Sequence, residues 1–458
     1  MSCFLLLLSA PGFAIVGCGG SDGSPADANA GGAASAGHPG AAASAGRAGG
    51  LVSGNAGASP AGGSASSAGQ SPSVGGADAS SAGAAAMGGT AMGGTATGGT
   101  SSAGAPGTSG SAGTAGKGSA GASANGGGSS GSGGGSASLA PCDIYAAGNT
   151  PCVAAHSTVR ALFGSYTGNL YQVRRASDKT TKDIAVQGPD GFANSAAQDT
   201  FCANTTCTIS VIYDQSTQGN HLTVTPPGGW LANGGTEAKA SAAKITVGGH
   251  AVYGVYTTGS FDEAVGGVGY RNNKTKGVAT GDQPEGIYMV ASGKHYNQWC
   301  CFDYGNAETN NKDNGPGTME TLYFGNSTQW GRGSGTGPWV MADLEDGVFG
   351  GGSFAAPPSN TSLSVTFVTA MLGGKAGSFR LKGGDSQSGT LKTMYDGARP
   401  SGGYDPMKKE GAIILGVGGD NSHTGEGTFF EGCLTSGYPS DASENAVQAN
   451  IVAAGYGR

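Results

Sequence analysis

The chain has 458 residues, of which 92 are Gly, and only 12% of its residues are charged. Its net charge of −7 and its 23 Lys and Arg, without a basic run, argue against a nucleic-acid-binding protein, because polyanion binding draws on clustered positive charge. The same charge disfavours an anionic membrane surface as a partner. A neutral polymer such as a polysaccharide is compatible with it.

Residues 4–17 form a short apolar run, broken by Pro11 and Gly12, that is typical of the apolar region of a signal peptide. The run ends in Ile-Val-Gly-Cys, which resembles a bacterial lipobox. We therefore expect residues 1–18 to be a lipoprotein-type signal, with Cys18 lipidated at a cell surface or outer membrane. The alternative is an ordinary secretory signal with a chance Cys, and a secreted protein. One feature departs from the signal pattern, because no Lys or Arg precedes the run.

Residues 19–140 form a segment rich in Gly, Ala and Ser that we expect to be a disordered linker. Between Ser21 and Ala140 there is no aromatic residue and no Ile, so the segment cannot bury enough apolar surface to offset the chain entropy of folding. A five-residue repeat within it, AMGGT-AMGGT-ATGGT, is too short for a solenoid unit. The folded domain is thus placed at residues 141–458.

The folded part is predicted to consist mainly of short β segments separated by Gly, Asn, Asp and Pro, which favours an all-β sandwich. One helix is expected over residues 152–163, with Thr150 as its N-cap and Pro151 at its first position. A C-terminal helix is expected from the capping-box spacing of Asp441 and Glu444. The predicted strands are 207–214, 244–256, 286–291, 338–345, 362–372, 378–382, 412–417 and 428–435.

The cysteines of the folded part suggest local disulfides, which persist in exported proteins. The pairs that proximity favours are Cys142–Cys152 and Cys202–Cys207. The adjacent Cys300 and Cys301 leave two interpretations open, a strained bridge between neighbours or two thiols that are reduced or bridged elsewhere. No metal or other cofactor is expected, since there is no C-x-x-C pair and the six His are scattered.

Two segments carry carboxylates in places that suit catalysis. In the predicted strand 338–345, side-chain alternation puts Asp343 and Glu345 on one face, where their repulsion favours either a cleft with perturbed pKa values or a solvated strand end. Asp420 follows the apolar strand 412–417 on a glycine loop, which lets a ligand approach the backbone closely and suits an acid or base. Asp-Asn-Ser at this place is also ordinary turn chemistry.

Seven longer segments together resemble the catalytic domain of glycoside hydrolase family 54, the α-L-arabinofuranosidases. They are PCDIYAAGNTPCVAAHSTVRALF (141–163), AQDTFCANTTC (197–207), IYDQSTQGNHL (212–222), YNQWCCFDYGNAET (296–309), GPWVMADLE (337–345), YDPMKKEGAIILGVGGDNS (404–422) and EGCLTSGYPSD (431–441). The resemblance covers essentially the whole folded part. It implies a concanavalin-like β-sandwich, or jelly roll, and hydrolysis with retention of configuration.

By this resemblance Glu345 is the nucleophile and Asp420 the general acid/base. In retaining enzymes one carboxylate attacks the anomeric carbon, while the other carboxyl protonates the leaving oxygen and then activates water. Glu345 is therefore expected to be ionised at rest and Asp420 to hold a proton. The residues that the resemblance places against the sugar are Asp343, Asp346, Gly347 and Gly419, with Trp330 in the pocket wall and a Cys300–Cys301 disulfide as an apolar platform under the furanose ring.

The sequence departs from the family pattern at three positions. Asp346 and Gly347 each stand where the family has Asn, which leaves the substrate preference open. Cys433 stands where relatives carry an aliphatic residue, and we interpret it as a buried free thiol. The family's usual C-terminal arabinose-binding β-trefoil is not expected.

The resemblance implies a monomer that releases terminal non-reducing arabinofuranose from arabinoxylan, arabinan and their oligosaccharides. Nucleic acid is not an expected partner, and contact with a membrane is expected only through the N-terminal lipid. One alternative is a non-catalytic carbohydrate-binding surface lipoprotein. Another is a related exo-glycosidase that acts on xylosides or galactofuranosides.

Overall fold

The computed structural model describes residues 139–458. The predicted signal, Cys18 and nearly all of the predicted linker lie outside this part of the chain. The described residues form two large antiparallel sheets and three helices, so the prediction of an all-β sandwich with minor helices is confirmed. Across these residues, no helix combines the length and the apolar character needed to cross a membrane.

The sheets are named here sheet one and sheet two. The helices are α1 (Pro141–Ala147), α2 (Ser195–Phe201) and α3 (Asp441–Ala454). The strands of sheet one, in pairing order, are β17 (Ser388–Ala398), β16 (Ser378–Asp385), β15 (Phe367–Lys375), β10 (Glu285–Tyr296), β19 (Gly427–Ser436), β8 (His250–Thr257) and β7 (Ala243–Val247), with β1 (Cys152–Ser157) also pairing with β19. The strands of sheet two, in pairing order, are β14 (Val348–Phe349), β13 (Trp339–Asp343), β12 (Glu320–Gly325), β11 (Asp303–Ala307), β18 (Ala412–Leu415), β9 (Tyr270–Asn272), β6 (Leu222–Val224), β5 (Cys207–Ile212), β2 (Asn169–Arg175), β3 (Thr181–Gln187) and β4 (Phe192–Ala193).

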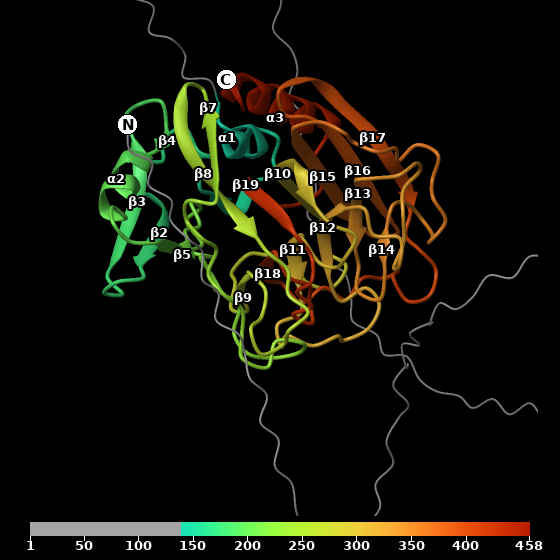
Figure 1. The fold of residues 1–458 in the computed structure, drawn as a ribbon. Helices are drawn as coiled ribbons and strands as arrows, with labels where there is room; N and C mark the ends of the chain where they lie inside the picture. The colour runs from blue at the N-terminus through green and yellow to red at the C-terminus, as the bar shows by residue number, and fades with distance from the viewer. Residues whose placement is uncertain (1–138) are drawn as a thin grey trace, which may run out of the picture. The chain divides into compact units, whose positions relative to one another are not determined.

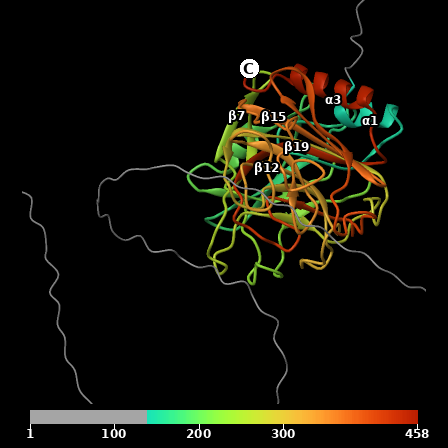
Figure 2. The ribbon, with the colours of Figure 1, turned by 90° about the vertical axis from the view of Figure 1, so that its right-hand side faces the viewer.

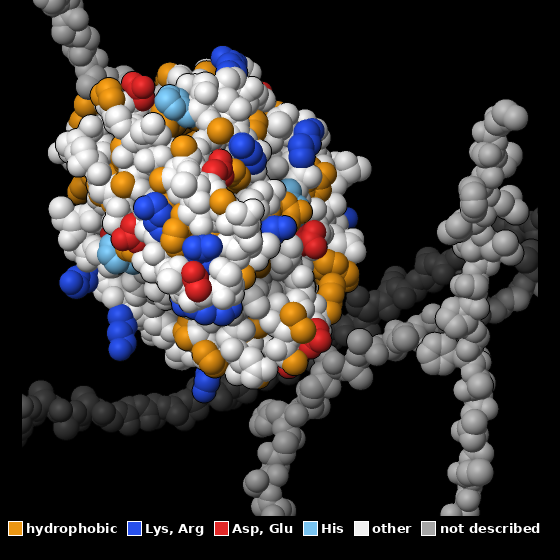
Figure 3. Space-filling view, turned by 60° about the vertical axis from the view of Figure 1, so that its left-hand side comes forward, with side chains coloured by type: hydrophobic (Ala, Val, Ile, Leu, Met, Phe, Trp, Pro, Cys, Tyr) orange, Lys and Arg blue, Asp and Glu red, His pale blue; other side chains and the backbone are white. Residues whose placement is uncertain are grey.

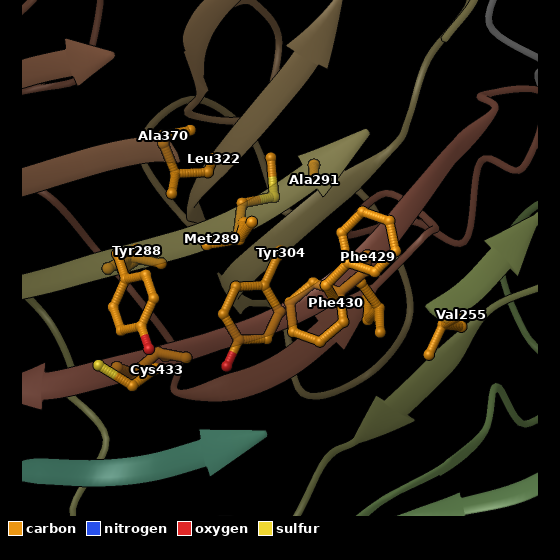
Figure 4. Close-up of a cluster of buried hydrophobic side chains, with 14 of the residues drawn as sticks. Val255, Tyr288, Met289, Ala291, Tyr304, Leu322, Ala370, Phe429, Phe430 and Cys433 are labelled. Carbon is orange, nitrogen blue, oxygen red and sulfur yellow. The ribbon is translucent and has the colours of Figure 1, made fainter. Parts of the chain in front are cut away.

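The main core lies between the two sheets and includes β10 and β19 in the middle of sheet one. Figure 4 shows part of it, with Tyr288 beside Cys433 and with Tyr304 beside Phe430. The ring of Tyr304 on β11 lies 4.9 Å from that of Phe429, so the contact joins sheet two to sheet one. Burial of each large apolar side chain contributes roughly 1.5–3 kcal/mol, which makes this layer the main source of stability.

Two helices pack side by side against sheet one, as Figures 1 and 2 show. The ring of Tyr145 on α1 lies 6.2 Å from that of Tyr288 on β10. The first turn of α3 is held by ion pairs, because the buried Glu444 accepts from Arg380 at 2.8 Å and from Lys382 at 2.7 Å. The face drawn in Figure 3 carries charges of both signs scattered among uncharged side chains.

The predicted helix over 152–163 is wrong. Cys152–Ser157 is strand β1, buried along its whole length and paired with β19, and the helix lies earlier, at Pro141–Ala147. Pro141, not Pro151, stands at the first helical position. Pairing with the central strand β19 outweighs the local cap signal at Thr150, because it buries the backbone polar groups of β1 with partners.

Two predicted strands are divided or shortened by turns. The predicted strand 244–256 is a hairpin of β7 and β8, which turns at Gly248 and Gly249 with φ of 56° and 81°. The predicted strand 338–345 ends at Asp343, because the following residues form a turn. The C-terminal helix is confirmed, but its N-cap is Ser440, whose side chain accepts the Ser443 N–H.

The expected disulfides Cys142–Cys152 and Cys202–Cys207 are present, and so is the bridge between the neighbours Cys300 and Cys301. Cys433 is a buried free thiol in the described part of the chain, as expected. Disulfides of this kind persist outside the reducing cytoplasm, so they agree with an exported protein.

Candidate active site

A cavity of about 500 Å³ lies on the face of sheet two that points away from the main core. Side-chain alternation along β13 sends Val340 and Ala342 into the core, whereas Trp339, Met341 and Asp343 point to the opposite face, as predicted. All nine residues that the family resemblance assigns to the site line this cavity: Cys300, Cys301, Trp330, Asp343, Glu345, Asp346, Gly347, Gly419 and Asp420.

Glu345 and Asp346 are the two central residues of the tight turn between β13 and β14. The Leu344 N–H donates to the Gly347 carbonyl at 3.1 Å, and φ is 62° at Glu345 and 55° at Asp346. Two successive positive φ values are those of a type I′ hairpin turn, which Asn and Gly usually occupy. This conformation costs a non-glycine residue about 1–2 kcal/mol. The turn that directs Glu345 into the cavity therefore lowers the stability of the fold.

The Glu345 turn is also fixed by Asp343. The carboxyl of Asp343 accepts the backbone N–H of Glu345 at 3.2 Å through Oδ1. Its other oxygen, Oδ2, lies 3.5 Å from Cys300 Sγ and 3.6 Å from Cys301 Sγ. Asp343 therefore connects the turn that carries Glu345 to the bridged cysteine pair.

The loop after β18 carries Asp420. Asp420 Oδ1 accepts the Ser422 N–H at 2.8 Å, and Ser422 Oγ lies 3.3 Å from Cys301 Sγ. Arg271 of β9 holds the loop from behind by donating to the Gly419 carbonyl at 2.7 Å. The bridged cysteines thus touch both carboxylate-bearing segments, one through Asp343 and the other through Ser422.

Because the carboxyl groups at the cavity are buried, their ionisation is energetically unfavourable. Burial, followed by the charges of Glu308, Asp343 and Asp420, raises the pKa of Glu345 to about 11. Burial likewise raises the pKa of Asp343 to about 7. The carboxyls cannot all be ionised together at neutral pH, so protons are shared within the group, and the expected ionised Glu345 requires a neighbour to keep its proton.

Asp303 adds one more carboxyl to this set, deeper in the protein and close to the cysteine pair. It is fully buried, its carboxyl lies within 4.8 Å of that of Asp343, and no donor among the described residues reaches either of its oxygens. Burial, together with the charge of Asp343, raises its pKa well above the usual range. These surroundings favour the protonated form of Asp303.

Comparisons with known proteins identify the family of the chain. The family model described as alpha-L-arabinofuranosidase B, catalytic, matches residues 141–457. The chain belongs to this family, glycoside hydrolase family 54.

Curated and solved relatives of this arabinofuranosidase B family match over the same region. A probable alpha-L-arabinofuranosidase B of Aspergillus fumigatus is 58% identical over 321 residues, which cover 69% of this chain and 62% of that protein. The alpha-L-arabinofuranosidase B of Aspergillus oryzae is 56% identical over 329 residues, which cover 70% and 64%. A crystal structure of an arabinofuranosidase complexed with arabinofuranosyl-alpha-1,2-xylobiose is 53% identical with a TM-score of 0.67, covering 69% of this chain and 66% of that one. The chain spans slightly less than two thirds of the length of these relatives.

Several residues of this family 54 site were not singled out from the sequence. Arg271, Asp303 and Glu308 are buried and lie on or beside strands that are far from Glu345 in the sequence, so no local pattern marks them. Trp230 and Phe261 line the cavity while 59% and 73% exposed, in segments rich in Gly and polar residues that suggest only loops.

Proposed function

We propose that the protein is a retaining α-L-arabinofuranosidase in which Glu345 is the nucleophile and Asp420 the general acid/base. The observation that carries the proposal is that these two carboxyls line one cavity, on two separate loops that the Cys300–Cys301 pair joins, in a chain of this family. Retaining hydrolysis needs two carboxyl groups that reach the same glycosidic bond, and both of these line the cavity.

In the first step, the Glu345 carboxylate attacks the anomeric carbon while Asp420 gives its proton to the leaving glycosidic oxygen. The bond from the anomeric carbon to the aglycone breaks and a covalent arabinosyl ester with Glu345 forms. In the second step, Asp420 removes a proton from a water molecule, which attacks the same carbon and releases arabinose and the Glu345 carboxylate. Two inversions give net retention.

The remaining lining residues suit recognition of a small furanose ring. We assign Asp343, Asp346 and the backbone at Gly347 and Gly419 to the sugar hydroxyls. The Cys300–Cys301 pair and Trp330 supply the apolar surface, and they pack in one cluster with Trp339 and Met341.

The space around Gly347 accounts for its departure from the family's Asn. A Cβ atom at this position would lie 2.5 Å from the Phe349 ring and 3.1 Å from the Phe354 ring. The two rings lie 4.8 Å apart and fill the place of a side chain. A hydroxyl contact at this point of the cavity must therefore come from backbone groups or from Asp346.

The proposed substrates are terminal arabinofuranosyl groups of arabinoxylan, arabinan and their oligosaccharides. The complex of a relative with arabinofuranosyl-alpha-1,2-xylobiose supports an arabinose-substituted xylan fragment as one of them. A relative from Trichoderma koningii, 57% identical, is named arabinofuranosidase/B-xylosidase, which makes a β-xyloside the second candidate substrate. Aryl glycosides of arabinofuranose, xylose and galactofuranose, compared at equal concentration, separate these activities.

Export is proposed to follow the lipoprotein route, with Cys18 as the lipid-bearing residue and the catalytic domain acting as a monomer. The proposal rests on the lipobox-like Ile-Val-Gly-Cys of the sequence. Labelling with a fatty acid should mark the wild-type protein and not a Cys18→Ala variant. A labelled variant, or an unlabelled wild type, would favour ordinary secretion.

The decisive experiment replaces each catalytic carboxyl by its amide. We expect Asp420→Asn to lower kcat/KM for an aryl arabinofuranoside by about 10²–10⁴-fold, the usual contribution of a general acid or base, and Glu345→Gln to lower it further. Glu237→Gln is the matched control, because Glu237 pairs with Arg174 away from the cavity. Proton NMR of the first product anomer tests retention.

Two outcomes would contradict the proposal. Full activity in either amide variant would remove the assigned role. Binding of arabinose by the wild type without hydrolysis would instead favour the non-catalytic carbohydrate-binding alternative.

A further inference from the structure

Glu308 is a buried carboxyl directly behind the cavity, although it does not line it. It follows β11 and its side chain is fully buried. Thr318 Oγ1 donates a 2.6 Å hydrogen bond to Glu308 Oε1, whereas no donor in residues 139–458 reaches Oε2. A buried carboxylate oxygen without a donor is costly, so these contacts favour the acid form, in which Oε2 carries the proton.

Gly419 brings this carboxyl against the proposed nucleophile. Glu308 Oε2 occupies the place where a Cβ atom on residue 419 would lie, and Glu345 Oε2 is 2.9 Å from that same place. Asp420 is the next residue in the chain. Two carboxyl groups therefore meet at one backbone position, beside the residue that carries a third, and only a glycine leaves room for them.

Little positive charge balances this meeting point. The charged and titratable groups that act on Glu308 and Glu345 are Arg271, Asp313, Asp343, Glu410 and Asp420. The single cation among them, Arg271, bonds to the backbone carbonyls of Glu308 and Gly419 rather than to a carboxylate. Charging every carboxyl at once is therefore strongly unfavourable.

We infer that Glu308 is a positioning residue for the hydrolysis: it keeps its proton in the pH range in which Glu345 is ionised, and it releases that proton at higher pH. The inference rests on the proposed function and adds a third carboxyl to it. Glu308 is the neighbour whose charge opposes ionisation of Glu345 most strongly, so its proton does most to free the nucleophile. Burial raises the pKa of both carboxyls, so the two titrate as a coupled pair, and the fully buried Oε2 without a donor makes Glu308 the member that keeps its proton to higher pH.

This assignment has a directional consequence for the pH profile of kcat/KM, which reports on the free enzyme. On the acid limb Glu308 is neutral, so ionisation of Glu345 proceeds without its charge. On the alkaline limb Glu308 is ionised, and its negative charge opposes the formation of a further negative charge in the cavity. Glu308 therefore extends the pH range of activity at its alkaline end and leaves its acid end unchanged.

The test is Glu308→Gln, which mimics the protonated acid at every pH. Gln keeps an acceptor for Thr318 and places an N–H₂ donor where Oε2 lies. We expect the acid limb of the aryl arabinofuranoside profile to stay in place. We expect the alkaline limb to move down by on the order of one pH unit, the size of one buried charge acting at short range.

Three results would overturn the inference: an acid limb that moves down, an alkaline limb that moves up, or two limbs that stay unchanged. The first would mean that Glu308 is ionised on the acid limb. Glu237→Gln is the matched control and should leave both limbs unchanged. Thermal unfolding of Glu308→Gln checks its fold. If that variant does not fold, Thr318→Val replaces it. Loss of the Thr318 hydroxyl favours the neutral acid of Glu308, so the alkaline limb should move in the same direction by a smaller amount. An alkaline limb that does not move would overturn the inference.

The proposed function fails differently. A wild-type enzyme without arabinofuranosidase activity, or active Glu345→Gln and Asp420→Asn variants, would refute the catalytic assignment. The Glu308 inference fails only through the positions of the two limbs in an enzyme that is active.

Discussion

Buried acidic side chains occur in two regions of the molecule, and the regions differ in whether cations pair with the carboxylates. In the interior, Glu320 of β12 accepts from Lys409 at 2.8 Å and from Arg399 at 2.9 Å; although burial raises its pKa, these two cations lower it to about 2. On the outer face of sheet two, Glu308 and Asp303 are equally buried, but no cation within residues 139–458 reaches their carboxyl oxygens. Pairing with two cations keeps Glu320 ionised, whereas the absence of a cation leaves a buried carboxyl free to hold a proton, which acid/base catalysis requires.

The largest effect should come from breaking the paired region. Lys409 is buried between Glu320 and Glu285, at 2.8 Å and 3.0 Å. Lys409→Met leaves Glu285 without a cation, and we expect a loss of about 3–5 kcal/mol in the free energy of unfolding. Urea unfolding measures it. The adjacent Lys408→Met is the matched control, because Lys408 is exposed and should change stability by less than about 0.5 kcal/mol. Equal effects of the two variants would contradict the prediction.

The unpaired region should instead respond to pH. Since burial raises the pKa of Asp303, the unfolded chain loses this proton first as the pH rises above about 4. Wild-type stability is therefore lost from that pH upward, and Asp303→Asn, which cannot titrate, should lose less of it between pH 4 and pH 7.

Urea unfolding of wild type and Asp303→Asn at both pH values measures this difference. Asp190→Asn on the surface is the control, because the Asp190 side chain is 67% exposed. The same stability difference between Asp303→Asn and wild type at the two pH values would show that Asp303 does not hold its proton in the folded state.

The smallest effect concerns the strained turn. Asp346→Gly removes the cost of a side chain at φ 55°, and we expect a gain of roughly 0.5–1 kcal/mol in stability. KM for the arabinofuranoside should rise at the same time, because the proposed hydroxyl contact is lost. Asn204→Gly, at φ 61° on the surface, is the control and should change little, since Asn tolerates this conformation. A less stable Asp346→Gly variant would contradict the prediction.

The sequence predicts those features that depend on neighbouring residues. Alternation along β13 is local, and it correctly sends Asp343 and Trp339 to one face and Val340 to the other. The glycine loop before Asp420 and the helix that begins at Asp441 are local as well. The short-range pairing of Cys142 with Cys152 follows the same rule.

Features that depend on distant strands were not predicted. A cap signal at Thr150 and Pro151 indicated a helix, but the segment pairs with β19, nearly 300 residues later in the chain. Arg271 reaches the Asp420 loop only because β9 pairs with β18. Glu308 lies near Glu345 only because β11, β12 and β13 are neighbours in sheet two.

The two-residue turn at Glu345 and Asp346 also restricts how the site can vary in length. Both flanking strands, β13 and β14, are paired residue for residue up to the turn, at Asp343 with Val348. Insertion of one residue would change the turn type and rotate Glu345 away from the cavity, or shift β14 to the opposite side-chain phase. Variation at this turn is therefore confined to substitutions that keep its length of two residues.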